Sequence, residues 1–217
     1  MTNKILYLSI ISILLLSYCK KDTTVYNITG NISNKQTGLN VNGVKVSLDA
    51  KMIKDGVYNP SFVNVKDAFT DNSGNYAMEI AEEQVSDYRF RISKDGYFDY
   101  EETVTVDELQ SSTSFTKNFT MVAEAWIELK VKNTTPHGID DKITYRYTNI
   151  EVQGNGCCDN QPNTGNGPSY NESIECKVQS DDWIKLEWTV TKNGSQHVFD
   201  DSIHTEAGNT VIYTLNY

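Results

Sequence analysis

Three cysteine residues in the second half of the sequence form its densest group of reactive side chains. Cys157 and Cys158 are adjacent, and Cys176 lies on the other side of a Gly/Asn/Pro-rich loop at 154–171. In an oxidising compartment, thiols at such spacing are expected to form disulfides. A bond from Cys176 to either neighbour would close a loop of about 20 residues and contribute ~3 kcal/mol on the chain-entropy model. We therefore predict a disulfide that pins this loop.

The odd number of thiols leaves other arrangements open. One thiol of the three is left over, whether buried and free, joined to another molecule, or displaced by a strained Cys157–Cys158 disulfide. Zinc bound by the three cysteines and His137 has suitable ligand types, but adjacent cysteines fit tetrahedral geometry poorly. A catalytic thiol is the least favoured reading. We expect neither a metal nor a cofactor.

The three histidines, His137, His197 and His204, raise the question of acid–base catalysis. None lies in HExxH spacing or near a serine nucleophile motif, and no G-x-S-x-G occurs in the sequence. His197 and His204 flank Asp200-Asp201 on or beside predicted strands. We interpret them as solvated histidines and expect no enzyme. A hydrolase using His204 and Asp201 is the third hypothesis, because it requires residues that converge from distant strands.

Paired carboxylates could bind calcium on the loops of a β-sandwich. No complete D-x-D-x-D-G run is present, so solvated turns are the preferred interpretation of the three pairs, which are Asp140-Asp141, Asp181-Asp182 and Asp200-Asp201.

Aromatic side chains at predicted loops and strand ends are candidates for ligand contact. They combine a large apolar area with a polar tip, which suits stacking on sugar rings or anchoring a protein interface. The candidates are Tyr58, Tyr97, Tyr100, Tyr170 and Trp183.

The elements that position these residues are predicted to be β-strands. Apolar and polar residues alternate with period two, which is typical of half-buried antiparallel strands, at 44–48, 76–80, 88–92, 127–131 and 184–190. Turns are predicted at 71–75 and 94–96, and Asn193-Gly194 predicts a hairpin. The long connection at 50–65 is either a binding loop or a tolerated surface insertion, and the insertion is the favoured interpretation.

The first half resembles a known family. Ile28-Thr29-Gly30-Asn31-Ile32, Gly43 to Leu48, Thr70 to Tyr76, Tyr88 to Ile92 and Lys94 to Tyr97 are similar in order and spacing to the carboxypeptidase regulatory-like domain. That resemblance implies a non-catalytic, seven-stranded, transthyretin-like Greek-key sandwich that serves as a spacer or interaction module. We assign residues 25–123 to it.

Residues 124–217 are expected to form a second β-sandwich. Strands of the same alternating kind recur, so two tandem antiparallel sandwiches make up the predicted all-β fold. An immunoglobulin-like arrangement is the natural guess, although the Cys and Trp spacing of true immunoglobulin domains is absent.

The N-terminal segment is a targeting signal. Lys4 precedes twelve mostly apolar residues, Ile5 to Leu16, which is the length of a signal-peptide core and too short to span a ~30 Å hydrocarbon layer comfortably. Leu16-Ser17-Tyr18-Cys19 resembles the lipobox of bacterial lipoproteins, although Tyr18 departs from the usual small residue. The resemblance implies a signal peptide at 1–18, lipidation of Cys19 and a tether at 19–24, so that acyl chains hold the protein on a membrane.

Composition and the tether point to the cell envelope. Nineteen Lys and Arg against 29 Asp and Glu give a net charge of -10, and the basic residues are scattered, which argues against a nucleic-acid partner. Lys20-Lys21-Asp22 is similar to the start of surface-exported lipoproteins of Gram-negative bacteria, which implies the outer membrane, on its periplasmic or cell-surface face.

The leading hypothesis is a non-enzymatic envelope lipoprotein that binds protein or glycan through the 154–171 loop and nearby aromatic residues. The alternative is an accessory subunit of an outer-membrane uptake complex, whose partner would be a β-barrel.

Overall fold

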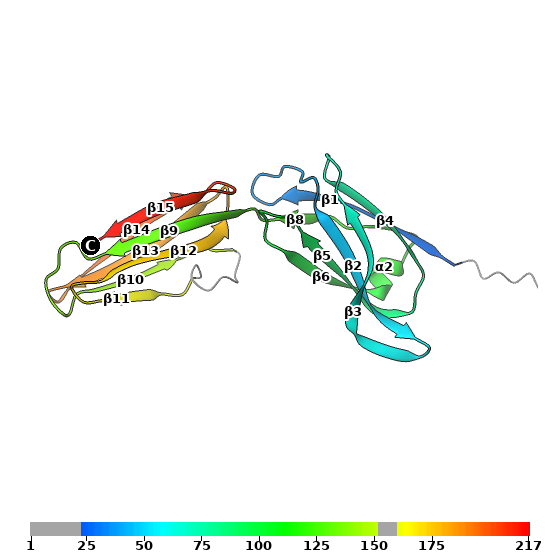
Figure 1. The fold of residues 1–217 in the computed structure, drawn as a ribbon, viewed down its shortest axis with the longest axis horizontal. Helices are drawn as coiled ribbons and strands as arrows, with labels where there is room; N and C mark the ends of the chain where they lie inside the picture. Colours follow the sequence, from blue (N-terminus) through cyan, green and yellow to red (C-terminus); the bar gives the residue numbers. More distant parts are fainter. Residues whose placement is uncertain (1–22, 152–159) are drawn as a thin grey trace, which may run out of the picture.

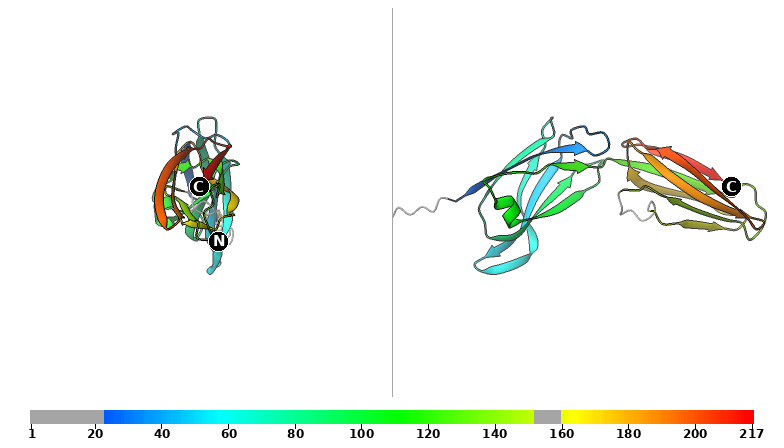
Figure 2. Two further views of the ribbon diagram at one scale, coloured as in Figure 1. Left: turned by 90° about the vertical axis from the view of Figure 1, so that its left-hand side faces the viewer. Right: turned by 180° about the vertical axis from the view of Figure 1, so that it is seen from behind.

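The computed structural model describes residues 23–151 and 160–217. Their regular structure is almost entirely β-strand, with one short helix, α2 (Val106–Gln110). Figures 1 and 2 show two β-sandwiches placed end to end. The described chain enters at the outer end of the first, and Tyr217 lies toward the outer end of the second. The predicted all-β fold of tandem sandwiches is confirmed.

The first sandwich consists of two sheets. In one sheet, β1 pairs antiparallel with β4 and parallel with both β7 and β8. The other sheet has the antiparallel order β3-β2-β5-β6. The strands are β1 (Val25–Asn34), β2 (Lys45–Lys54), β3 (Val57–Phe69), β4 (Asn75–Ala81), β5 (Val85–Ser93), β6 (Tyr100–Thr105), β7 (Ser114–Thr116) and β8 (Phe119–Met121).

The predicted alternation fills the core between these sheets. Val46 and Leu48 on β2 and Phe90 on β5 are fully buried. The ring of Phe90 lies 5.3 Å from that of Phe119 on β8, between centroids, which joins the two sheets. The period-two pattern therefore identified the inward face of each strand.

The connection at 50–65 is not an irregular loop but part of a hairpin, which was not predicted from the sequence. β2 and β3 form a long hairpin whose turn is Asp55-Gly56, with φ of 53° and 77°. Both turn residues have positive φ, as in the type I′ turns that suit two-residue hairpins. Two register shifts along β2 interrupt the alternation that would have revealed this hairpin in the sequence.

The second sandwich also has two sheets. One has the order β12-β9-β15, with β15 parallel to β9, and the other has the antiparallel order β11-β10-β13-β14. The strands are β9 (Glu124–Lys132), β10 (Lys142–Tyr147), β11 (Asn163–Asn166), β12 (Asn171–Gln179), β13 (Trp183–Lys192), β14 (Ser195–His204) and β15 (Thr210–Asn216). The Asn193-Gly194 turn joins β13 to β14, as predicted.

The sandwiches are joined by a short segment, 122–124, that is bonded to both of them. From the first sandwich, the amide of Phe98 donates to Val122 and the carbonyl of Gly96 accepts from Glu124, each at 2.9 Å. From the second, the amides of Ser180 and Gly208 donate to Ala123 and Glu124, also at 2.9 Å. The chain thus passes from one core to the next with its backbone held on both sides.

The described part of the chain contains no helix with the length and apolar character that crossing a bilayer requires.

Candidate binding groove at the junction

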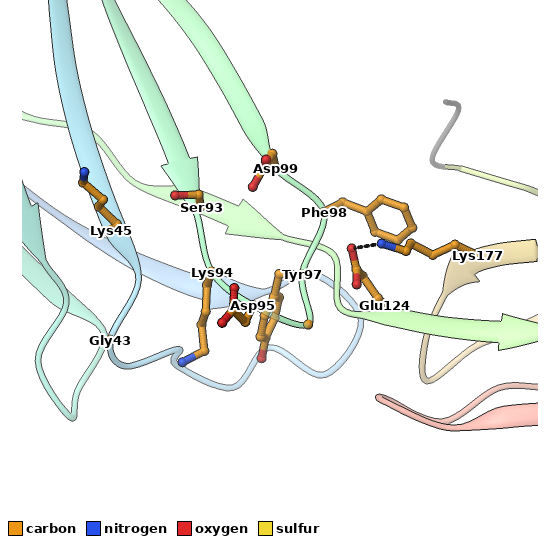
Figure 3. Close-up of a pocket in the computed structure, with 11 residues that line it drawn as sticks. Gly43, Lys45, Ser93, Lys94, Asp95, Tyr97, Phe98, Asp99, Glu124 and Lys177 are labelled. Carbon is orange, nitrogen blue, oxygen red and sulfur yellow. Dashed lines mark hydrogen bonds and ion pairs between the residues drawn. The ribbon is translucent and has the colours of Figure 1, made fainter. Parts of the chain in front are cut away.

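A series of connected hollows follows the segment that leads from β5 into β6. The largest lies beside the junction and has a volume of about 850 Å³. Figure 3 shows its lining, which draws on both sandwiches. The lining residues are Gly43, Lys45, Ser93, Lys94, Asp95, Gly96, Tyr97, Phe98, Asp99, Glu124 and Lys177.

Two further hollows continue from it along the open seam between β6 and β8. One, of about 340 Å³, is lined by Lys35, Phe98, Asp99, Tyr100, Thr120, Met121, Val122 and Glu151. The next, of about 370 Å³, is lined by Asn31, Ser33, Tyr100, Glu102, Asn118, Phe119 and Thr120. Neighbouring hollows share residues, Phe98 and Asp99 in the first case and Tyr100 and Thr120 in the second. We call the three together the junction groove.

The backbone of the groove is fixed by the predicted turn at 94–96. Gly96 has φ of 80°, and the amide of Tyr97 donates to the carbonyl of Lys94 at 3.1 Å. Tyr97 then forms a β-bridge with Ala123. The turn and the bridge hold the backbone at both ends of this short stretch, and the Tyr97 side chain packs partly against the first core.

Charges of both signs line the junction, and two of its lysines form ion pairs. Lys177 on β12 donates to Glu124 at 2.6 Å, and its Nζ lies 5.7 Å from the ring centroid of Phe98 (Figure 3). Lys35 of the first sandwich forms an ion pair with Glu151 of the second at 2.8 Å. These pairs leave the groove without a concentration of one charge, so it has no built-in preference for an ionic ligand.

Tyr100 is the most exposed aromatic residue of the groove, with 42% of its surface accessible. Its hydroxyl donates to Glu102 at 3.0 Å, and Lys117 donates to the other carboxylate oxygen at 2.6 Å. The bond from Lys117 lowers the pKa of Glu102, and burial raises the pKa of Tyr100. Glu102 is therefore an anion and Tyr100 a neutral phenol at physiological pH.

Polar groups that surround Tyr100 are open to a ligand. Asn118 accepts from the amide of Asn31 at 2.9 Å through its side-chain oxygen. Within residues 23–151 and 160–217, no hydrogen bond engages the Asn118 amide nitrogen or the hydroxyls of Ser33 and Thr120. An aromatic face bordered by amide and hydroxyl groups can stack on a sugar ring and bond its hydroxyls.

Of the five aromatic candidates from the sequence, two line the groove: Tyr97 lines the first hollow and packs partly against the first core, whereas Tyr100 lines the other two hollows. The others are elsewhere. Tyr58 is near the tip of the β2–β3 hairpin, and Trp183 is 59% exposed with its ring centroid 4.9 Å from that of His204. Tyr170 packs on the second core, its hydroxyl 3.3 Å from that of Tyr145.

The loop at 154–171, the predicted binding site, lies partly outside the described residues, which resume at 160, so its role in binding stays a prediction. Part of it is strand β11, an edge strand paired with β10, so the prediction of a continuous loop was wrong. Cys157 and Cys158 lie outside the described residues, and Cys176 is buried on β12 with 3% exposure. The predicted disulfide remains a prediction.

The histidines do not assemble with the acidic residues around them. Asp201 and His204 are three positions apart on β14, so they face opposite sides of the sheet. Asp201 accepts from Tyr213 at 2.6 Å, whereas His204 contacts Trp183. In the described part of the chain, no three His, Cys, Asp or Glu residues are placed to hold a metal ion.

One acidic pair differs from the prediction of solvated turns. Asp141 is only 2% exposed, and it accepts hydrogen bonds from the His137 amide and the Asn133 side chain at 2.8 Å and from the Gly138 amide at 3.3 Å. These donors, the His137 amide first, lower its pKa. Asp141 is thus a structural carboxylate that organises the far end of the second sandwich.

Sequence reasoning missed the rest of the groove because its residues come from distant segments. Lys35, Asn118 and Lys177 carry no motif, and only the fold places them together.

No protein-family model matches the chain, and no curated protein sequence matches it. Among solved structures, the chain is similar to the TIE protein of Bacillus anthracis, with 12% identity and a TM-score of 0.38, covering 89% of this chain and 34% of that one. It is similar to a streptococcal ancillary pilin, with 12% identity and a TM-score of 0.33, covering 91% and 63%. About half of it, 49%, is similar to 62% of the chlorocatechol 1,2-dioxygenase of Pseudomonas putida, with 16% identity and a TM-score of 0.32. The chain therefore spans less than two thirds of each of these proteins, and TM-scores at this level carry no argument about function.

Proposed function

We propose that the chain is a non-enzymatic lipoprotein of the outer membrane that binds a glycan in the junction groove. The observation that supports this proposal is the exposed ring of Tyr100, which lines one hollow together with Asn118, Ser33 and Thr120, whose side-chain amide and hydroxyls are open to a ligand. Carbohydrates present apolar C–H faces and many hydroxyls, which such a surface complements without a net charge.

The elongated arrangement of the two sandwiches supports a role in holding the binding groove away from the membrane. In the proposal, lipids on Cys19 anchor the N-terminal end, and the first sandwich is a spacer of the carboxypeptidase regulatory-like kind. The junction lies at the opposite end of the first sandwich from the start of β1 (Figure 1), and the groove runs from the junction along β6 and β8. Bonds from both sides to residues 122–124 limit hinge motion, so the groove is presented at a fixed distance from the membrane.

The proposal includes a disulfide from Cys176 to Cys157 or Cys158. Because Cys176 is buried in the second core, the bond would fasten the neighbouring segment to β12. Peptide mass mapping without reduction identifies the partner. Recovery of all three thiols in alkylated form would overturn this part of the proposal.

The binding proposal is tested with the mature chain on an array of neutral and acidic glycans. Tyr100→Ala and Asn118→Ala are expected to weaken the strongest interaction at least about tenfold, equivalent to ~1.4 kcal/mol. Trp183→Ala is the matched control, since it removes an exposed aromatic residue outside the groove. No glycan bound, or loss only in the Trp183 variant, would contradict the proposed site.

A pull-down in mild detergent tests the alternative role. If a β-barrel transporter is retained by the lipidated chain and lost with Cys19→Ala, an accessory subunit becomes the better description. Recovery of the chain without a barrel partner favours an autonomous binding module.

A further inference from the structure

We infer that the tip of the β2–β3 hairpin is a second membrane contact, which rests on the lipid–water interface beside the lipid anchor. This inference depends on the proposed lipidation of Cys19. With a protein surface on the membrane as well as the lipid anchor, the first sandwich would have a defined orientation relative to the bilayer.

Strand register places the tip at the anchored end of the first sandwich. β1 begins at Val25, which pairs with Ala81, and the pairing of β2 with β5 ends with Met52 opposite Val85. β2 continues past that pair to the Asp55-Gly56 turn, which adds about 10 Å at ~3.3 Å per residue. Figures 1 and 2 show the hairpin leaving the sandwich on the side where the described chain begins.

The side chains at the tip suit an interface between lipid and water. Val57 is 70% exposed and Tyr58 is 50% exposed, although both belong to a well-paired strand. Lys54 lies opposite Val57 and is also exposed, so its ammonium can stay in the headgroup layer while its stem packs on apolar groups. Tyrosine is enriched at membrane interfaces because it has an apolar ring and a polar hydroxyl.

The backbone of the tip is suited to partial immersion. Lys54 pairs with Val57, and Ile53 pairs with Tyr58 across the two-residue turn. The pair that flanks the turn bonds within the hairpin, and the amide of Ile53 donates to the carbonyl of Gln84 at 2.7 Å. Because antiparallel pairs alternate, other backbone groups at this edge point outward, so the tip suits the hydrated headgroup layer and not the hydrocarbon core.

The tether is short enough to bring the tip to the membrane. Four peptide steps separate Cys19 from Thr23, the first described residue, and they span at most about 14 Å. A lipidated Cys19 would hold Thr23, two residues before the start of β1, within that distance of the bilayer, and the hairpin projects toward the same side by about 10 Å. A bilayer surface is thus the partner that the tip is positioned to meet.

The test uses the full lipidated chain in vesicles of phosphatidylethanolamine and phosphatidylglycerol, with and without brominated acyl chains. Tyr58→Trp places a fluorophore at the tip, and the native tryptophans, Trp126, Trp183 and Trp188, all belong to the second sandwich. Phe69→Trp is the matched control, because Phe69 is 64% exposed at the opposite end of the same strand.

The emission added at position 58 is expected to fall about twofold with brominated lipid, as for a residue buried in the interface, while emission added at position 69 stays unchanged. Vesicle flotation is measured on the same samples. If the protein floats with the vesicles but emission at positions 58 and 69 is quenched equally or not at all, the hairpin contact is overturned and the lipid anchor is not. Failure to float overturns the anchor and the hairpin contact together, while glycan binding on the array remains a separate result.

Discussion

The Nζ of Lys177 lies 2.6 Å from a carboxylate oxygen of Glu124 and 5.7 Å from the ring centroid of Phe98, so one side chain of the second sandwich touches an aromatic ring of the first. Lys177 also lies 5.6 Å from the ring of Trp126. This contact adds a side-chain link to the four backbone bonds at residues 122–124.

Lys177→Met is expected to lower the free energy of unfolding by about 1 kcal/mol, because it removes an ion pair and cation–π contacts while keeping most of the apolar stem. Urea unfolding followed by tryptophan fluorescence measures the change. Lys185→Met is the control, since Lys185 is an exposed lysine of the same sandwich with no ion pair among the described residues, and a change below ~0.5 kcal/mol is expected there. Equal losses in the two variants would show that the contact at the junction contributes nothing specific.

Asp49→Asn is expected to destabilise the first sandwich by roughly 2–3 kcal/mol. The Asp49 side chain is 2% exposed, and Arg89 and Arg91 donate to it at 3.0 and 2.9 Å. Without its charge, Arg91 loses its anionic partner on the outer face of the sheet, and Arg89 keeps only the longer pair with Glu101 at 3.5 Å. Thermal and urea unfolding of the variant measure the effect. A decrease in the free energy of unfolding below ~0.5 kcal/mol would mean that water solvates the two arginines well enough to replace Asp49.

Asp67→Asn is the matched control for this variant. Asp67 also pairs with a cation, Lys45, at 3.0 Å, but its side chain is 37% exposed. We expect a loss of less than ~1 kcal/mol, as for other exposed pairs.

Acid is expected to weaken the same sheet. The hydrogen bond from Arg91 lowers the pKa of Asp49, and bonds from Ser47 and Lys45 lower that of Asp67 to about 2. For a carboxylate with a lowered folded-state pKa, the stabilisation is complete above the unfolded pKa of about 3.9 and is lost as pH falls through the folded-state value. Stability should therefore decrease from about pH 4 toward pH 2.

Urea midpoints across this range provide the measurement, and the Asp49→Asn/Asp67→Asn double variant is the comparison. The free energy of unfolding of the variant should fall less on acidification than that of the parent. It should still fall to some extent, because the pKa values of Asp141 and Asp201 are also lowered in the folded state. If the free energy of unfolding fell equally with pH in the two proteins, Asp49 and Asp67 would not be responsible for the loss of stability in acid.

The sequence predicted local structure well where one side of a strand is apolar. The alternation at Val44, Val46 and Leu48 identified buried positions, and Asn193-Gly194 identified a hairpin, because both signals depend on neighbours in the chain. The same alternation says nothing of what covers the outer face. Asp49 is buried there because Arg89, Arg91 and other side chains from β3 and β5 meet it.

The site was less predictable than the fold. Tyr97 and Tyr100 were recognised as aromatic residues at strand ends, but nothing in their surroundings along the chain distinguished them from Tyr58 or Trp183. Their selection depends on Asn118 and Lys35, which lie near them only after the strands of the first sandwich have assembled. Contacts between residues so far apart in sequence leave no periodic or local signal.

Gly30→Ala is expected to destabilise the first sandwich by about 3 kcal/mol or more, through overpacking. A Cβ on Gly30 would lie 1.8 Å from the carbonyl oxygen of Lys117 and 2.6 Å from the ring of Tyr76. The Tyr76 hydroxyl donates to that same carbonyl at 2.7 Å, so relief of the clash requires β1 to move away from a bonded pair. Gly138→Ala is the control, because no atom lies within 4 Å of its added Cβ and its φ is not positive. Thermal unfolding should show a large fall in melting temperature for the first variant and almost none for the second, and an unchanged value for Gly30→Ala would refute the close approach of β1 to the 117 carbonyl.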